Sequence, residues 1–378
     1  MNFFAKIRNF FIRHSKLRFL AKFLLLILAI IISSAALTFG GLEAGCRPSA
    51  ASLPGLQAQS QIPSGNIRPE VSTYLSYPEW FIVYSSDEYA QFLAQNRPSR
   101  FPYFGSIHQY WSNYCKVYAI TKARHEFNAG DHLMLFVIGW SYSAEYAAKG
   151  VYENTIGRLS EIFGKYPATE EDIYAGKVAK NYVDFIRLRP FYEYNFAGAF
   201  SHLWTDNNFF GPHFARKLER RIALSLEYGV KTIYCKLIGI GSHSVYGVES
   251  VDTYVIANNV SDAIFSSHPE IEKIKALGPK KYLMIIPRYQ PFTDLVPRLA
   301  KQGVEFLEIA GNREIFMTAL VPSNVQYLPP AGQVVFQTNI LTNPSKKRIA
   351  LSVPVEVLSQ VLPQLMSSGG IVEHIYDY

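Results

Sequence analysis

The chain has few cysteines and few charged residues for its length. Three cysteines occur in 378 residues, Cys46, Cys115 and Cys235, and no two of them form a C-x-x-C pair. This excludes thioredoxin-like redox sites, zinc ribbons and c-type haem attachment. Charged residues make up 18% of the chain, below the roughly 25% of average soluble proteins, whereas aromatic residues make up 15%. Such a composition is too apolar for disorder and suits a large core, a membrane-contacting surface, or both.

Sequence motifs that would identify an enzyme class are also missing. No P-loop is present, and the glycine-spaced segment 239–247 does not have the G-x-G-x-x-G spacing of a dinucleotide site. Ser141 follows Gly139, but Ser143 stands where a nucleophile elbow requires glycine. We therefore interpret 239–247 as a loop, with a phosphate or oxyanion site as the alternative.

The net charge of +7 is concentrated at the N-terminus. Residues 1–22 carry six cations and no acid, so residues 23–378 sum to +7 − 6 = +1. A nucleic-acid-binding domain needs a basic face on its folded part, so this distribution argues against a nucleic-acid partner. Basic residues beside an apolar segment are instead typical of a chain that contacts anionic lipid.

An uncharged run of 20 residues, 23–42, follows this basic tail. About 20 apolar residues in a helix span the hydrocarbon core of a bilayer, and the positive-inside rule places residues 1–22 in the cytoplasm. We expect a single-pass anchor with the bulk of the chain in a periplasm or lumen. The alternatives are a signal peptide cleaved near Ser33–Ala36, a lipoprotein modified at Cys46, and a buried helix of a soluble protein.

A stretch poor in aromatic residues and charges, 43–72, separates the anchor from the rest and is expected to be a flexible linker. An oxidising compartment would permit a Cys115–Cys235 disulfide. Two separate buried thiols are the simpler interpretation, and we favour it.

Residues 73–260 are expected to form a mainly helical, aromatic-rich domain. Capping-box patterns at Ser76–Glu79 and Ser85–Glu88 predict two helix starts, Leu133 begins a long buried helix reaching about 163, and Thr169 starts another. On the long helix Ser141, Glu145, Lys149 and Glu153 form one polar stripe, along which Lys149 can pair with Glu145 and with Glu153. The stripe is either a cleft lining or, as we favour, a solvated face.

A further helix is predicted from Pro212 to Tyr228 and is expected to end at Gly229. It carries a basic cluster, Arg216, Lys217, Arg220 and Arg221, that would contact lipid headgroups or, more simply, be solvated. Whether residues 230–240 continue as a helix or form a strand is not decided by their periodicity.

The C-terminal part is predicted to be of the α+β class. After a connecting segment, 261–278, the order of apolar runs and turns over 279–378 predicts strands at 281–288, 304–310, 314–321, 333–341, 348–353 and 371–376, with helices at 293–302 and 354–367. This order resembles two split β-α-β units, a ferredoxin-like layout with an added strand. The layout implies no activity.

The side chains that could carry chemistry are dispersed histidines. His125 and His132 stand near Glu126 and Asp131, while His202 and His213 flank Asp206. Together with Glu145, these four histidines are our candidate catalytic residues, although their spacing matches no defined zinc pattern and the metal, if any, is unknown.

The leading hypothesis is a non-enzymatic, membrane-anchored, extracytoplasmic protein whose aromatic-rich domain binds an apolar ligand or a membrane-protein partner. The alternative is a membrane-tethered enzyme that uses these histidines, with or without a metal. A third possibility is that the helical domain itself dips into the bilayer.

Overall fold

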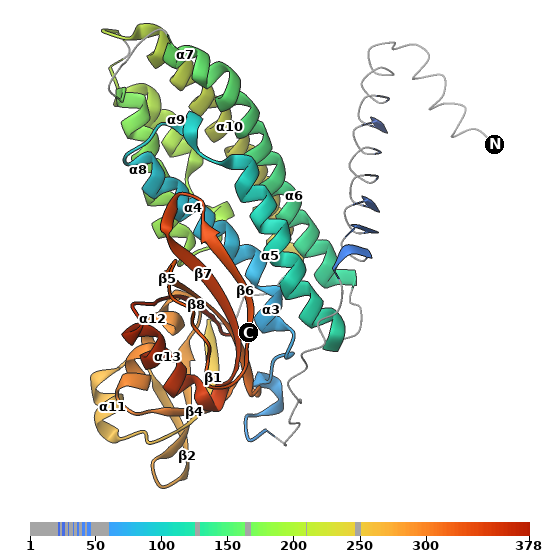
Figure 1. Ribbon diagram of the computed structural model, residues 1–378, viewed down its shortest axis with the longest axis vertical. Coiled ribbons are helices and arrows are strands. Elements are labelled where there is room, and N and C mark those ends of the chain that lie inside the picture. Colours follow the sequence, from blue (N-terminus) through green and yellow to red (C-terminus); the bar gives the residue numbers. More distant parts are fainter. Residues whose placement is uncertain are drawn as a thin grey trace, which may run out of the picture. The chain divides into compact units, whose positions relative to one another are not determined.

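The computed structural model describes residues 60–124, 129–162, 168–208, 210–245 and 251–378, with scattered positions between 22 and 46 that are helical (Figure 1). Met1–Ser49 and Ala50–Tyr378 are two separate units, and the elements named below belong to the second. The predicted anchor lies largely outside the described residues, as do residues 47–59 of the predicted linker. Within those residues, no helix is both long enough and apolar enough to cross a bilayer.

The first part of the second unit is helical, as predicted. Its helices are α3 (Ser72–Leu75), α4 (Tyr77–Leu93), α5 (Tyr103–Arg124), α6 (Ala129–Tyr152), α7 (Arg158–Ile162), α8 (Glu170–Ile186), α9 (Phe196–Thr205) and α10 (Phe214–Val245). A π-helical turn, η3 (Glu153–Gly157), joins α6 to α7. Short 3-10 turns, η1 (Ser64–Asn66), η2 (Pro98–Arg100) and η4 (Phe191–Glu193), connect other elements.

Of the three helix starts predicted at Ser76, Ser85 and Thr169, two are confirmed. The α8 helix begins with a complete capping box between Thr169 and Asp172. The α4 helix begins after Ser76 with a proline in its first turn, although the Ser76 hydroxyl makes no cap bond. The start predicted at Ser85 is wrong, because Ser85 lies inside α4, where it is buried and bonded to Tyr142.

The predicted end of the last helix at Gly229 is also wrong. The α10 helix continues to Val245, so residues 230–240 are helical rather than a strand. A glycine inside a helix costs about 1 kcal/mol relative to alanine, which tertiary packing of a long helix can offset.

The C-terminal part consists of two four-stranded antiparallel sheets rather than one. The first contains β1 (Asp252–Asn258), β2 (Glu272–Gly278), β3 (Lys281–Pro287) and β4 (Glu305–Ile309), with helices α11 (Asp262–Ser267) and α12 (Gln290–Lys301). The second contains β5 (Glu314–Pro322), β6 (Gln333–Ile340), β7 (Asn343–Pro354) and β8 (Ile371–Tyr376), with η5 (Val355–Val357) and α13 (Leu358–Ser367).

The two sheets repeat one strand order. The first is ordered β2-β3-β1-β4 and the second β6-β7-β5-β8, so β5 to β8 occupy the places of β1 to β4. Residues 323–332 connect β5 to β6 in the second sheet, whereas α11 makes the equivalent connection from β1 to β2 in the first. All neighbouring strands are antiparallel.

The region of strands begins earlier than the predicted boundary at 279, and residues 261–278 are not a simple connection. The β1 strand, α11 and β2 precede that boundary. We missed β2 because it is exposed along almost its whole length, so it lacks the alternation of apolar and polar residues that marks a half-buried strand.

The second sheet is buried on both faces. Along β5, Ile315, Met317 and Ala319 belong to an aliphatic core shared with the first sheet, α12 and α13. Phe316, between them, points to the opposite face and packs in an aromatic core with Tyr77 of α4 and other residues of α3 to α6. Because successive strand residues face opposite sides, this one sheet connects the C-terminal core to the helical part.

The Cys115–Cys235 disulfide is wrong, and the favoured prediction of two separate buried thiols is confirmed for Cys235 but wrong for Cys115. Cys46 and Cys115 are each disulfide-bonded, whereas Cys235 is a free, buried thiol.

Candidate functional site

Five of the six lysines and arginines of α10 lie on the side of the helix that packs against other helices. The side chains of Arg216, Lys217, Arg220, Arg221 and Lys231 are each no more than 9% exposed. The sequence suggested that the cluster at 216–221 contacts lipid headgroups or solvent, and both interpretations are wrong. Buried cations require acidic partners, and the acids come from α6, η3, α7, α8 and α10 itself.

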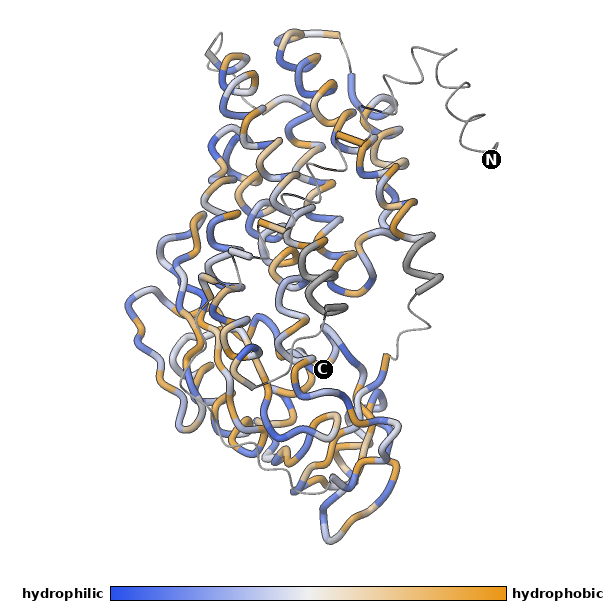
Figure 2. Tube along the Cα trace, turned by 90° about the vertical axis from the view of Figure 1, so that its right-hand side faces the viewer, coloured by the Kyte–Doolittle hydropathy of each residue, from blue (hydrophilic) through white to orange (hydrophobic). Residues whose placement is uncertain are grey.

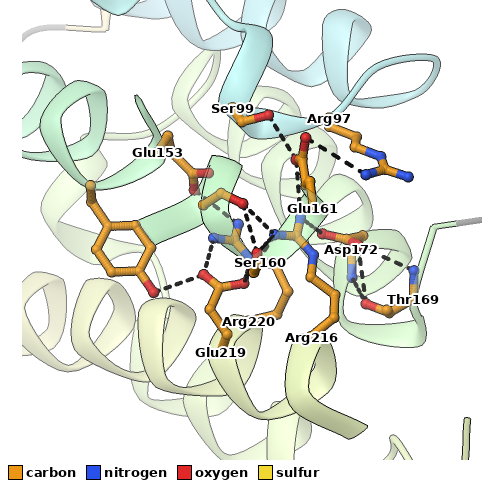
Figure 3. A network of polar contacts seen from close by, with 12 residues as sticks. Arg97, Ser99, Glu153, Ser160, Glu161, Thr169, Asp172, Arg216, Glu219 and Arg220 are labelled. Carbon is orange, nitrogen blue, oxygen red and sulfur yellow. Dashed lines mark hydrogen bonds and ion pairs between the residues drawn. The ribbon is translucent and has the colours of Figure 1, made fainter. Parts of the chain in front are cut away.

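Arg216 and Arg220 form the centre of one network (Figure 3). Arg216 contacts the carboxylate of Asp172 at 3.1 Å and that of Glu219 at 3.0 Å. Arg220 contacts Glu153 at 2.9 Å and the second oxygen of Glu219 at 2.6 Å. Glu219 therefore bridges the two guanidinium groups and connects η3 to the first turn of α8 through α10.

A second pair of contacts ties α10 to the beginning of α8. The Arg221 guanidinium donates to Glu171 at 2.8 Å, and this pair is almost completely buried. Lys217 contacts Glu170 at 3.1 Å. The acids of this first turn also interact favourably with the positive end of the α8 dipole.

Further along α10, two lysines and two glutamates form a cluster between α6 and α10, in which each lysine contacts both glutamates. Lys149 contacts Glu145 at 2.9 Å and Glu227 at 2.7 Å, and Lys231 contacts the same two carboxylates at 2.9 Å and 3.1 Å. Burial alone would raise the pKa of Glu145, but the ammonium groups of Lys231 and Lys149 lower it to about 2. Glu145 is thus held ionised as part of a salt-bridge quartet.

These contacts revise our interpretation of the polar stripe on the long helix. Glu145 pairs with Lys149 as predicted, but Glu153 pairs with Arg220 rather than with Lys149. The prediction of a solvated face is wrong for Glu145, Lys149 and Glu153, which contact α10, whereas Ser141 is exposed. The π turn lies where Glu153 enters the network, and a side chain at Gly157 would require the Glu153 carboxylate to shift.

The opposite side of α10 is apolar and exposed. Ile222, Leu226, Val230, Ile233 and Leu237 are between 48% and 65% exposed, and their spacing of four, four, three and four residues keeps them on one side of the helix. Figure 2 shows apolar and polar residues alternating along the helices of this region. In an ordinary surface helix the apolar side faces the core. The inner side of α10 does contribute Leu224, Tyr228 and Cys235 to a buried cluster, but most of its cations are also inside and its exposed side is apolar, and in this sense α10 is inverted. We call the five exposed residues the outer face of α10.

Two aromatic residues of α9 extend this apolar surface. Phe200 and Trp204 are 40% and 44% exposed. The Trp204 indole donates to the Ser225 hydroxyl at 2.9 Å, and Ser225 directly precedes Leu226 in α10. The Arg221 guanidinium lies over the Trp204 ring at 5.4 Å, which positions the ring beside the outer face.

A separate buried polar cluster lies between α4 and the second sheet. Arg348 of β7 contacts both oxygens of Glu373 at 2.6 Å and Glu88 at 2.9 Å. Beside it, the His374 ring stacks on Trp80 with centroids 3.4 Å apart, and its Nδ1 bonds the Thr293 hydroxyl at 2.8 Å. Burial lowers the pKa of His374 well below its usual value.

The predicted catalytic residues occupy different surroundings. His125 lies outside the described residues, as does the side chain of His132. His202 is exposed on α9 and pairs with Asp206 at 3.0 Å. His213 precedes α10 with a positive φ of 65°, and Glu145 belongs to the quartet. A catalytic role for these residues stays a prediction.

No group of three or more histidine, cysteine or acidic side chains suited to a metal ion occurs among the described residues. In the comparisons with known proteins, no protein-family model, no curated protein and no solved structure matches the chain.

Our sequence reasoning missed the outer face of α10, although its signal was present. The spacing of Ile222, Leu226, Val230, Ile233 and Leu237 is visible in the sequence, but such a stripe ordinarily marks the side that packs against the core. Only the acidic partners of Arg216, Arg220 and Arg221, on other helices, reveal which side is inside.

Proposed function

We propose that this chain is a membrane-anchored, extracytoplasmic protein that binds an apolar ligand or a membrane-protein partner through the outer face of α10. The inversion of α10 carries the proposal. Soluble monomers rarely expose extended apolar patches, and those that do use them for binding. Here the charged side of the helix forms salt bridges inside the protein. The exposed apolar side is therefore not part of the core of the monomer and is available for binding.

The anchor and the compartment rest on independent support. The uncharged run at 23–42 follows six cations without an acid, the pattern of a segment inserted with its N-terminus in the cytoplasm. Disulfides persist in oxidising compartments and are rare in the cytosol, so the oxidised state of Cys46 and Cys115 supports a periplasmic or lumenal location for the bulk of the chain.

We further assign each sheet-containing unit to the ferredoxin-like class. Residues 252–309 follow the order β-α-β-β-α-β, which is characteristic of that class, and residues 314–376 repeat it without the first helix. Because this class hosts many unrelated activities, the assignment supports a scaffold that holds the helical part rather than a particular reaction.

Site-specific photo-crosslinking in intact membranes tests the binding face. A benzophenone amino acid at Leu226 should give an adduct with a membrane protein or an apolar small molecule, identified by mass spectrometry. The same probe at Leu188, which is 65% exposed but lies after α8, should give none. Equal adducts at both positions, or none at Leu226, would contradict the binding role of α10.

Topology has its own test. A C-terminal alkaline phosphatase fusion should be active in whole cells, and the protein should resist carbonate extraction. A reporter that is active only in the cytosol would overturn the proposed location, whatever the crosslinking shows.

A further inference from the structure

The outer face of α10 contains no charged side chain. At 100° per residue, its five apolar residues and Gly229 fall within an arc of about 100°, and nothing lies within 4 Å of a side chain built at Gly229. Lys236 is exposed just outside this arc. A helix that lies on an anionic bilayer carries basic residues around its apolar side, whereas the cations of α10 are mostly buried. The face therefore fits an apolar, uncharged protein surface better than lipid headgroups.

The spacing of these residues is also self-complementary. Ile222 and Leu237 are equidistant from a point between Gly229 and Val230, and so are Leu226 and Ile233. If two such helices run antiparallel about that point, Ile222 meets Leu237 and Leu226 meets Ile233. A two-fold axis requires this kind of match, because the same patch must fit itself. Gly229 at the centre allows the two backbones to approach closely.

The exposed apolar surface is close in size to one side of a stable dimer interface. At about 200 Å² for a large apolar side chain, the outer face and the flanking Phe200 and Trp204 expose roughly 700 Å². A standard stable interface buries about 800 Å² on each partner. The helix presents this surface over 16 residues, 222–237, which is about 24 Å along its axis.

We propose that the outer face of α10 packs antiparallel against the same face of a second copy of this chain, about a two-fold axis between Gly229 and Val230. This inference rests on the proposed binding role of α10 and names its partner. The internal salt bridges hold α10 against α6 and α8, so the face is preformed and dimerisation orders little additional structure.

Cysteine crosslinking of the full chain in membranes tests the orientation. Two differently tagged copies, one with Ile222→Cys and one with Leu237→Cys, should form a mixed disulfide on mild oxidation. Each variant alone should not crosslink, because identical positions in the antiparallel pair lie about 22 Å apart along the axis. Crosslinks between identical positions would show a parallel pair, and the absence of any crosslink would show no pair. Either result overturns the proposal.

Charge substitutions test the contact itself. Leu226→Glu should weaken dimerisation in liposomes, measured by energy transfer between labelled copies, by roughly a hundredfold, because two carboxylates would each be buried against an apolar residue. Adding Ile233→Lys to the same chain should restore dimerisation, since each acid then meets a lysine. Leu188→Glu, of similar exposure, should have no effect. If Leu226→Glu dimerised as well as the wild type, the proposed contact through the outer face of α10 would be wrong.

Two further outcomes are distinguishable. If no crosslink forms and a fluorophore at Ile233 is quenched by spin-labelled lipid, the face contacts the bilayer and the dimer is wrong. If the crosslink forms but the protein fractionates as soluble, the dimer stands and the proposed anchor fails.

Discussion

The layer between α6, α8 and α10 and the layer between the two sheets are both buried, but the first combines apolar contacts with buried ion pairs, whereas the second is aliphatic. The helical layer contains arginines, lysines and carboxylates in alternating contact. The layer between the sheets contains aliphatic side chains such as Leu295, Leu351 and Leu362, all with almost no exposure. Apolar burial is non-directional, whereas a buried ion is tolerated only with its partners in place.

This difference has a consequence for the outer surfaces. The C-terminal part follows the usual rule, with apolar residues inside. In the helical part, the charged side chains of α10 make internal contacts, whereas apolar side chains of the same helix are exposed. Buried ion pairs are weak evidence for stability and are retained in some proteins for specificity. Here the salt bridges fix which side of α10 faces outward, so the two layers differ in role as well as in composition.

The largest expected effect is the loss of one buried cation. Arg220→Ala leaves Glu153 and Glu219 buried without their shared partner, and removal of one member of a buried ion pair costs about 3–5 kcal/mol. The loss should appear in the free energy of unfolding from urea titrations at pH 7. Burial already raises the pKa of Glu153, so the cost should shrink as the pH falls and this carboxyl becomes neutral. A loss below about 1 kcal/mol would show that water replaces the arginine.

An aliphatic truncation in the other layer should cost slightly less and should not depend on pH. Leu362→Ala in α13 opens a cavity between the sheets, and such substitutions cost about 2–5 kcal/mol. Leu362→Met, which conserves volume, should cost under about 1.5 kcal/mol. The two unfolding curves at pH 7 and pH 5 should give the same difference from wild type. A strong pH dependence would mean that the aliphatic layer is coupled to a titrating group.

The same contrast explains which parts of the fold were predictable from sequence. The last strand was predicted at its observed bounds, 371–376, and β3, β5, β6 and α12 were placed within a few residues. These elements bury apolar side chains at regular spacing, which the sequence shows directly. The exposure of the apolar side of α10 was not predictable in this way. An amphipathic helix has the same sequence pattern whether its apolar side is buried or exposed. The acidic partners of α10 on α8 are 44 to 50 residues away.

The sequence singled out several members of the candidate site but few of their contacts. Glu145 was singled out, and its pairing with Lys149 was correctly predicted, but its contact with Lys231 depends on the packing of α6 against α10. Of the candidate histidines, His202 pairs with Asp206 instead of with a member of these networks. A pattern of residue types along the chain cannot show which charges meet between helices, and the π turn at Glu153–Gly157 has no sequence signal that we could have used.

A histidine in the junction between the two regions should make stability depend on mildly acidic pH. Burial keeps the pKa of His374 well below its usual value, while the unfolded chain binds a proton below about pH 6.5. The unfolded state therefore gains protons first, and stability is lost as the pH falls below that value. The slope approaches 1.4 kcal/mol per pH unit.

The matched variant for this measurement is His374→Phe, which retains a ring against Trp80 but cannot titrate. Between pH 6.5 and 5, the difference in unfolding free energy between wild type and variant should shift against the wild type, and above pH 7 it should be constant. Trp80 fluorescence can report the transition. Parallel pH profiles of the two proteins would show that His374 titrates normally, and the junction would then be more open to water than its burial implies.

The smallest expected effect isolates burial as the cause of the contrast. Lys180 and Asp184 on α8 form an ion pair at 2.8 Å, the same distance as Arg221 and Glu171, but their side chains are 71% and 53% exposed. Exposed pairs of this spacing contribute about 0.3–0.5 kcal/mol and are screened by salt. Lys180→Ala should therefore shift the unfolding free energy by no more than that, and the shift should vanish in 1 M NaCl. If the loss of unfolding free energy in Lys180→Ala matched that in Arg220→Ala, burial of the charges would make no difference to their contribution. The buried ion pairs of α10 would then not explain how the helical layer differs from the sheets.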